Sequence, residues 1–410
     1  MKLRKIHIQN FRAIENREIR FDDAFGAIRP VTVLAGPNGC GKTSALFAIV
    51  QPLRGVMGYR STDVPDPDDL DIHRKAAVGG LVRKPLSVTI NLDVEFEQCE
   101  IQAIPKVFED TRDLRFRPEE VPSEIGGEGS GSDLSASGIE PPEDELPPLP
   151  DRRIQVTWTY PPDRQPNGRL KPWWFLSNTD PWKAVPWFYG RKYAIRGWIN
   201  RRLRDRSLLD DVGGLYLFPQ DRNLQSRVVG NLAKLPGIQD RIAEERHRAL
   251  EQISVWGILQ YLSNYAQGQE KRLDDGSRDI WEERIREGFR RICSPKEYLG
   301  FMYQTDDPVG APYFKDGNSV YPLQMAASGE QVIIEYLTRL TYPSPLNHSL
   351  ILIDEPEIHL HPGWIRQLYR ALPRIGVGNQ FILTTHSIEL REMAAEDGAL
   401  VEMGDLVESP

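Results

Sequence analysis

Alternating and continuous apolar stretches predict most of the strands of this chain. Apolar and polar residues alternate over residues 3–9, as in a strand with one buried face, and a second strand is expected around 18–21. Residues 31–35 (VTVLA) are apolar and β-branched, which suits a strand buried on both faces. Strict alternation over residues 87–97 and 153–160 predicts two further strands.

The second half of the chain changes from a helical pattern to alternating strands and helices. Residues 222–296 show helical periodicity broken by Gly and Pro, without the sustained heptads of a long coiled coil. From residue 298 the chain returns to strands, and the apolar runs 350–353 and 381–384 predict two buried ones. The outer parts of the chain therefore predict one α/β domain, and the middle predicts an insertion into it.

A strongly acidic, polar segment separates two of the predicted strands. Residues 122–150 contain seven acidic residues and no Lys or Arg, so they account for −7 of the net charge of −8. Their Gly, Ser and Pro content leaves too little apolar surface to offset the entropy lost on ordering. We expect a disordered loop over 118–151 within a domain, because strands flank it. The rest of the chain is close to neutral, so overall charge decides little about partners.

Length and composition exclude several protein classes. The 410 residues are 40% apolar and 27% charged, which is typical of a globular protein with a large core. No run of 18 apolar residues predicts a membrane span, and the N-terminal sequence lacks the apolar region of a signal peptide. The three cysteines are too few and too scattered for a disulfide framework or a zinc site. A reducing cytoplasm is the expected location.

Residues 36–43, GPNGCGKT, match the pattern GxxxxGK[ST] between a predicted strand and a predicted helix. Glycines let the backbone wrap around phosphate oxygens, and the helix N-terminus offers free N–H groups and a positive dipole end. Lys42 is expected to reach the β- and γ-phosphates of ATP, and Thr43 to offer its hydroxyl to Mg²⁺. The predicted nucleotide-binding residues of this loop are Asn38, Gly39, Cys40, Gly41, Lys42, Thr43 and Ser44.

A second motif follows the apolar run 350–353. Asp354 and Glu355 emerge at the carboxyl end of this predicted strand, where ligands bind in open α/β sheets. We expect Asp354 to hold Mg²⁺, directly or through water, and Glu355 to orient and polarise the attacking water. An apolar run followed by two acidic residues is weak evidence for a nucleotide site when it occurs alone. Its occurrence together with residues 36–43 strengthens that evidence.

Two further motifs complete the predicted site. Residues 328–331, SGEQ, precede the acidic motif at the start of a predicted helix, where a serine can simply be an N-cap. In this order they are typical of the signature motif of ABC-type ATPases, so Ser328, Gly329 and Glu330 are expected to face the γ-phosphate of ATP held by a second subunit. His386 follows the strand predicted over 381–384, which suits a switch histidine that senses the γ-phosphate.

Together these motifs resemble the SMC-, RecF- and OLD-like branch of ABC-type ATPases. Residues 8–12, IQNFR, resemble the N-terminal strand and turn of that branch, where Arg12 would approach the nucleotide. Residues 354–362, DEPEIHLHP, are similar to a stretch of OLD-like ATPases and of antiphage ATPases of the PARIS and Septu systems. The resemblance covers residues 1–60 and 298–400.

The resemblance implies an α/β fold, the ABC-type (P-loop NTPase) ATPase head with a mixed β-sheet and an inserted helical or lid region. It also implies that Gln220 is the residue that links Mg²⁺ to the helical lobe. The expected divisions are residues 1–100 and 298–410 for the two parts of the head, 118–151 for the acidic loop, 152–221 for a Trp-rich and basic segment, and 222–297 for the helical insertion.

One departure from the OLD-like pattern concerns the effector. OLD-like proteins usually carry a C-terminal TOPRIM nuclease domain, and this chain ends soon after His386. An effector nuclease or toxin is therefore expected to be a separate chain.

Two other groups of residues have competing interpretations. Residues 187–206 mix arginines with aromatic residues, which suits phosphate and base contacts or contact with an acidic surface of a protein partner. We favour a helix with a solvated basic face and an aromatic core side. His359 and His361 lie beside Glu357, but a spacing of two does not place them on one helix face, so we expect no metal site there. We assign no redox role to Cys40, which lies within the predicted phosphate-binding loop.

The sequence thus predicts an ATPase with ATP and Mg²⁺ as cofactors that forms a homodimer or higher homo-oligomer through its ATP sites. The favoured hypothesis is a regulatory subunit of a bacterial antiphage system that controls a separate effector. A DNA-repair ATPase that clamps DNA and a nucleotide-gated scaffold with little turnover remain as alternatives.

Overall fold

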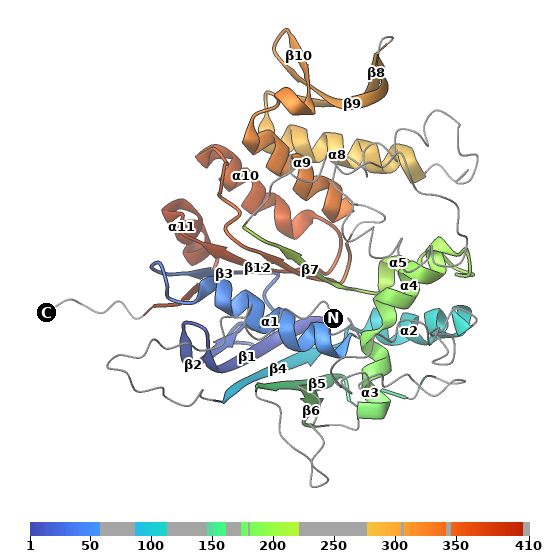
Figure 1. The fold of residues 1–410 in the computed structure, drawn as a ribbon, viewed down its shortest axis with the longest axis vertical. Coiled ribbons are helices and arrows are strands. Elements are labelled where there is room, and N and C mark those ends of the chain that lie inside the picture. The colour runs from blue at the N-terminus through green and yellow to red at the C-terminus, as the bar shows by residue number, and fades with distance from the viewer. Residues whose placement is uncertain are drawn as a thin grey trace, which may run out of the picture.

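The computed structural model describes residues 1–57, 87–112, 146, 148–149, 151–160, 174–178, 181–220, 277–304, 307–341 and 346–404. Two five-stranded sheets form the body of the molecule, and helices lie between and above them (Figure 1). The largest parts of the predicted acidic loop 118–151 and of the predicted insertion 222–297 lie outside the described residues.

The first sheet is antiparallel, with the strand order β2-β1-β4-β5-β6. Its strands are β1 (Lys2–Phe11), β2 (Ile14–Arg20), β4 (Val88–Glu95), β5 (Arg153–Tyr160) and β6 (Trp174–Leu176). The alternating stretches of the sequence form this sheet, because each strand turns one face to the core and the other toward solvent.

The second sheet is parallel throughout, with the strand order β13-β3-β12-β11-β7. Its strands are β3 (Val31–Ala35), β7 (Leu215–Phe218), β11 (Leu350–Ile353), β12 (Gln380–Thr385) and β13 (Leu400–Glu402). The expected α/β head is confirmed, and its parallel and antiparallel strands are separated into two sheets.

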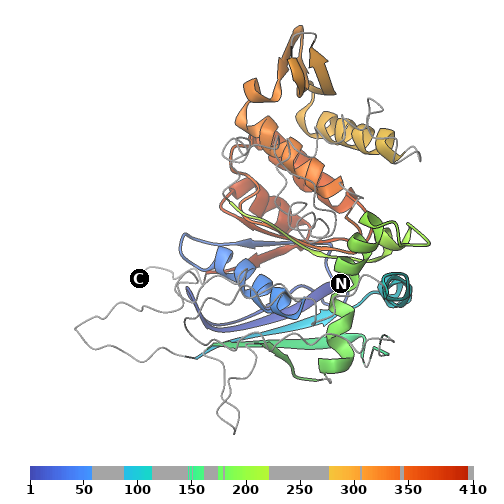
Figure 2. The same cartoon turned by 45° about the vertical axis from the view of Figure 1, so that its right-hand side comes forward.

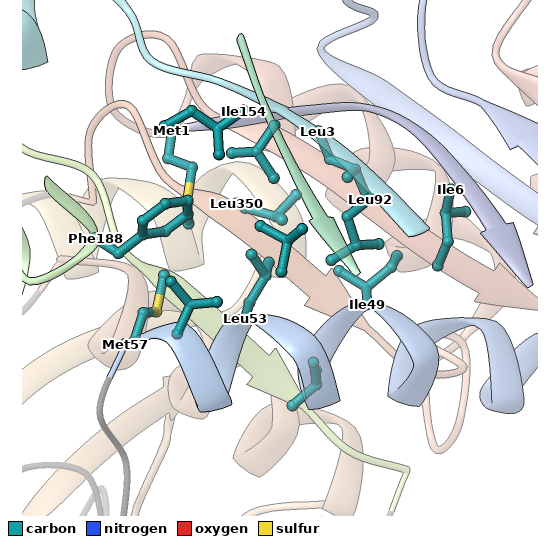
Figure 3. Packing of buried hydrophobic residues seen from close by; sticks show 14 of the residues in the cluster. Met1, Leu3, Ile6, Ile49, Leu53, Met57, Leu92, Ile154, Phe188 and Leu350 are labelled. Atoms are coloured by element: carbon teal, nitrogen blue, oxygen red, sulfur yellow. The ribbon is translucent and has the colours of Figure 1, made fainter. Parts of the chain in front are cut away.

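Helix α1 (Lys42–Val56) lies between the two sheets (Figure 2). Ile49 and Leu53, one turn apart, face Leu3 and Leu92 of the antiparallel sheet and Leu350 of the parallel sheet (Figure 3). All five side chains are completely buried. One apolar cluster therefore joins both sheets through this helix.

The parallel strands are buried on both faces. Along β11, Leu350 and Leu352 belong to the cluster around α1, and Ile351 and Ile353 belong to a second cluster on the opposite face. That second layer contains α8 (Ser277–Cys293), α9 (Ser328–Thr341), α10 (Pro362–Ala371) and α11 (Ile388–Glu396). Two buried faces explain why the sequence runs apolar here instead of alternating.

A polar contact also ties the two sheets together. Gln380, the first residue of β12, is completely buried, and its side-chain amide meets the backbone of Leu3 in β1. The Leu3 N–H donates to Gln380 Oε1 and Gln380 Nε2 donates to the Leu3 carbonyl, each at 2.7 Å. The two sheets are not paired strand to strand, and the Gln380 amide makes the two hydrogen bonds with Leu3 that the backbone of a neighbouring strand would otherwise make.

A small antiparallel sheet projects beyond the helical layer (Figure 1). It consists of β8 (Glu297–Gln304), β9 (Asp307–Asp316) and β10 (Ser319–Pro322). The short helix η5 (Leu323–Met325) then leads directly into α9.

The other described helices are α2 (Gln98–Asp110), α3 (Pro181–Phe188), α4 (Gly190–Ile199) and α5 (Leu208–Asp211), and the short helix η6 (Leu372–Arg374) follows α10. Among them, α2 packs against α4 and α5. Trp187 and Tyr193 are buried in the cluster around α1, and the buried Arg191 donates to the Leu209 and Val212 carbonyls. The aromatic residues of the basic stretch therefore form core, as the favoured interpretation expected. Within the described residues, no helix is long and apolar enough to cross a membrane.

Candidate nucleotide site

Four parallel strands bring their following loops to one edge of the sheet. Strand β12 lies between β3 and β11, and β7 lies on the other side of β11. The register pairs Thr385 with Ala35, and Ile353 with Phe218, so these strands end side by side. Because ligands bind at the carboxyl ends of such strands, this edge is the candidate site.

The glycine-rich loop after β3 has the conformation that its sequence predicted. Gly39 and Gly41 have φ values of +79° and +96°, which side chains rarely permit. A Cβ on Gly41 would also lie only 2.6 Å from Ile14 Cγ1, because the turn between β1 and β2 packs on the loop. The Lys42 side chain is 4% exposed and donates to the carbonyls of Gly36 at 2.8 Å and Pro37 at 3.0 Å. Lys42 thus reaches back over its own loop.

Arg12 lies at the same turn. Its guanidinium carbon is 4.4 Å from the ring centroid of Phe47, which is on the second turn of α1. This cation–π contact holds Arg12 beside the helix that begins at the loop. Its expected approach to the nucleotide stays a prediction.

Two oxygen donors meet where a metal ion was expected. The Thr43 hydroxyl lies 3.0 Å and 3.1 Å from the carboxylate oxygens of Asp354, which is 4% exposed. The Thr384 hydroxyl donates to Asp354 Oδ1 and accepts from the Glu355 N–H at 3.0 Å. Since Mg²⁺ prefers hydroxyl and carboxylate oxygens, Thr43 and Asp354 fit such an ion. Sequence reasoning missed Thr384, which fixes both acidic residues.

Glu355 is the meeting point of the remaining site residues. Gln220 Nε2 lies 3.0 Å from Glu355 Oε2, and His386 Nε2 lies 3.3 Å from Glu355 Oε1. On its other side, His386 Nδ1 lies 3.5 Å from Lys42 Nζ. Because an ammonium only donates, the network assigns Nδ1 as acceptor and the proton to Nε2, which donates to Glu355.

The local electrostatics and backbone of Glu355 are unusual. Burial raises the pKa of its carboxyl, and the charges of Asp354 and Glu357 raise it further against the opposing effects of His386 and Lys42. Its φ of +48° lies in the left-handed region that non-glycine residues seldom adopt. Strain of this kind concentrates at functional sites.

Glu357 is a second residue that the sequence analysis did not assign to the site. Its Oε1 accepts hydrogen bonds from the Thr385 hydroxyl at 2.7 Å, the His386 N–H at 2.6 Å and the Ser387 N–H at 3.1 Å. The sequence signals for it were its position three residues after Asp354 and its place in the stretch 354–362 that resembles OLD-like ATPases.

The signature residues begin α9, away from this edge. Ser328 is exposed, and a Cβ on Gly329 would lie 2.7 Å from the carbonyl oxygen of His359, so the helix packs closely on the loop after β11. Helix α9 belongs to the layer on the opposite face of the parallel sheet from α1. Figures 1 and 2 both show the start of α9 apart from the start of α1.

Glu330 corrects one expectation. Its side chain is 1% exposed, with Oε1 accepting from Lys296 Nζ at 2.6 Å and the Tyr321 hydroxyl at 2.7 Å. Its Oε2 accepts from the Ala327 N–H at 2.7 Å. Both oxygens are therefore used to fix the start of α9, and Glu330 is not placed to touch a nucleotide. The same pairing raises the pKa of Lys296.

The two histidines after β11 were weighed as metal ligands in the sequence analysis. His361 caps α10 by accepting from the Gly363 N–H at 3.1 Å. Among the described residues, one group has the donor types of a metal site, namely Glu97, Cys99 and His348. Glu97 already hydrogen-bonds His348 at 2.7 Å and lies 3.9 Å from Lys2 Nζ, so these polar contacts account for its carboxylate.

Comparison with known protein families decides the class. The family model described as "AAA domain, putative AbiEii toxin, Type IV TA system" matches residues 180–392, more than half of the chain. The chain belongs to this AAA family. A second model, described as "AAA ATPase domain", matches residues 1–114. The two matches together include both the glycine-rich loop and the loops after β7, β11 and β12.

Solved structures of SMC heads are similar at low identity. An SMC head bound to the C-terminal winged-helix domain of ScpA has 13% identity and a TM-score of 0.46, with 95% of this chain and 91% of that chain covered. The Pyrococcus furiosus SMC head with a bound ScpA domain has 12% identity, a TM-score of 0.43, and coverage of 98% and 92%. The Thermotoga maritima SMC head has 14% identity, a TM-score of 0.38, and coverage of 96% and 92%.

Proposed function

We propose that this AAA-family chain binds ATP with Mg²⁺ and hydrolyses it at a site that a second copy completes. One observation carries the proposal. Lys42 and Thr43 at the start of α1 meet Asp354 and Glu355 after β11 and His386 after β12 at the carboxyl edge of the parallel sheet. This set contains a cation suited to phosphate, oxygens suited to a metal ion and a half-buried carboxyl group beside them.

The first half of the chemistry is phosphate binding. The glycine-rich loop and the N-terminus of α1 present backbone N–H groups to the phosphates, and Lys42 leaves the carbonyls of Gly36 and Pro37 to bind the β- and γ-phosphates. Thr43 and Asp354 would hold Mg²⁺. Gln220 lies close to this pair because its side-chain amide donates to Glu355, the residue after Asp354. When bound, Mg²⁺ neutralises phosphate charge in the transition state.

The second half is activation of water. Glu355 orients the attacking water and accepts its proton, and its raised pKa suits a base in a half-buried site. His386 contacts both Glu355 and the Lys42 ammonium, so it can register the γ-phosphate that Lys42 binds.

A second copy supplies what one chain lacks. Ser328 is exposed at the N-terminus of α9, whose free N–H groups favour an anion, yet α9 packs on the opposite face of the sheet from α1. We infer that Ser328 and Gly329 contact the γ-phosphate of ATP held by the partner. ATP then acts as a clamp, since its γ-phosphate stabilises the closed dimer.

The favoured biological role is that of a regulatory ATPase in a bacterial antiphage system, acting on a separate nuclease or toxin. The name of the matched family includes a toxin of a type IV TA system, which agrees with an effector-linked role. The alternative is an ATPase that clamps DNA. The exposed Arg201 and Arg202 offer the charge for it, and charge reversal of both would then abolish ATP-dependent, salt-sensitive DNA binding.

Substitution of Glu355→Gln tests the enzymatic proposal. We expect the variant to bind ATP and form a stable dimer without turnover, because the amide keeps the shape of the side chain and removes the base. Glu283→Gln, which alters an exposed ion pair of α8, serves as the matched control with wild-type turnover. Hydrolysis by Glu355→Gln at the wild-type rate would show that the base is assigned wrongly.

A further inference from the structure

We propose that Glu357 is a positioning residue that holds the loop after β12 so that His386 faces Glu355. This inference rests on the proposed function of that site. One carboxylate oxygen, Glu357 Oε1, receives donors from the three consecutive residues 385–387. It fixes this segment at the point where the strand ends and α11 begins.

Two of these donors are backbone N–H groups, which makes the contact specific for loop conformation. The N–H groups of His386 and Ser387 both point at Glu357 Oε1, at 2.6 Å and 3.1 Å. Bonds from N–H groups to a charged acceptor are stronger than neutral ones. The backbone of His386 is therefore oriented by Glu357, whatever its own side chain does.

The fixed backbone determines where the imidazole lies. With its N–H held by Glu357, His386 places Nε2 3.3 Å from Glu355 Oε1 and Nδ1 3.5 Å from Lys42 Nζ. Glu357 thereby links the loop after β11 to the loop after β12, since it is only two residues from Glu355. A shift of either loop separates the imidazole from its partners.

Only one oxygen of this carboxylate accepts hydrogen bonds. Within the described residues, Glu357 Oε2 is buried without a hydrogen-bond partner, and an unpaired buried oxygen is destabilising. The start of α11 also has its own cap, because Ser387 Oγ accepts from the Leu390 N–H at 3.3 Å. A buried, unpaired carboxylate oxygen beside the catalytic machinery is typical of functional sites.

The test compares Glu357→Ala, Glu357→Gln and the control Glu389→Gln, which removes another carboxylate at the start of α11. We expect Glu357→Ala to lower kcat about 100-fold, as for a small misplacement of a catalytic group, with unchanged ATP affinity. Glu357→Gln, whose oxygen can still accept the three bonds, recovers part of this loss. Glu389→Gln turns over like the wild type.

A double variant separates positioning from a merely structural role. If Glu357 acts through His386, then kcat of the double variant is less than about threefold below kcat of His386→Ala alone. Losses that multiply, or wild-type kcat in Glu357→Ala, would overturn the inference. Glu355→Gln is measured in parallel: its inactivity beside a fully active Glu357→Ala refutes only the role of Glu357, whereas full activity of Glu355→Gln refutes the proposed function.

Hydrogen exchange gives a readout that does not need turnover. In Glu357→Ala the backbone N–H of His386 loses its acceptor, and the N–H of Ser387 keeps only the Thr385 hydroxyl at 2.9 Å. Exchange of that peptide, at His386 above all, should therefore accelerate while exchange of α1 stays unchanged. Unchanged protection of this peptide would overturn the inference even in a preparation without ATPase activity.

Discussion

The hydroxyl oxygen of Thr43 lies 3.0 Å and 3.1 Å from the two carboxylate oxygens of Asp354. Thr43 belongs to the helix that follows β3, and Asp354 directly follows β11, with β12 between the two strands. Parallel order brings these donors from the two ends of the chain to one edge. The contact is the metal-binding part of the proposed site.

Substitution of Asp354→Asn should remove most of the effect of Mg²⁺ on ATP binding. The amide preserves size and can still accept from Thr43, but it carries no charge for a divalent cation. We expect ATP affinity measured by calorimetry with Mg²⁺ to fall about tenfold or more, which corresponds to about 1.4 kcal/mol. Affinity in EDTA should hardly change. Wild-type dependence on Mg²⁺ in the variant would contradict the assignment.

Substitution of Gln380→Leu should weaken the junction between the two sheets. The leucine keeps the volume and leaves the buried N–H and carbonyl of Leu3 without their partner. Each of these two unsatisfied groups costs about 1–3 kcal/mol, so we expect the free energy of unfolding to fall by about 2–6 kcal/mol. Urea denaturation measures the change. A loss below 0.5 kcal/mol, the size usual for a surface substitution, would show that water or relaxation satisfies Leu3.

The pair formed by Glu97 and His348 should make stability depend on acid pH. Burial alone would raise the pKa of Glu97, but the hydrogen bond with His348 and the charges of Lys2 and the N-terminal ammonium outweigh it, so the pKa is lowered. A depressed carboxyl pKa stabilises the fold above the unfolded value of about 4.3, and this contribution is lost as pH falls through the folded pKa.

Glu97→Gln tests this linkage. The wild type should be more stable than the variant near neutral pH, and the difference should shrink as pH falls below about 4.3. Denaturation midpoints over a pH series measure it. A difference that stays constant across the series would contradict a contribution from Glu97 ionisation.

The sequence predicted the elements that depend on local patterns. Residues 31–35 and 153–160 form β3 and β5 with the predicted bounds, because two-sided burial and strict alternation each leave a clear pattern. The glycine-rich loop could also be predicted from the sequence, because Gly39 and Gly41 adopt backbone torsions that few other residues allow. The family match to an AAA domain agrees with the coarser part of what these motifs indicated, and the finer branch stays a prediction.

Contacts between loops that are far apart in the chain could not be predicted from the sequence. The role of Glu357 depends on residues 385–387, which the order of parallel strands brings beside it. Glu330 was expected at the nucleotide because its motif suggested it, but its carboxylate contacts Lys296, just before β8, and Tyr321 of β10. Only tertiary packing decides whether such a residue faces a ligand or the core.

Mixing two inactive variants tests most directly whether the site is shared between two copies. Lys42→Ala damages the phosphate loop, and Ser328→Arg blocks the N-terminus of α9, so each variant alone should lack ATPase activity. In a mixed dimer, the intact loop of one copy faces the intact α9 of the other. We therefore predict that mixing restores ATP hydrolysis, measured as phosphate release. Mixtures as inactive as the separate variants, with mixed dimers demonstrated by differential tags, would contradict the shared site.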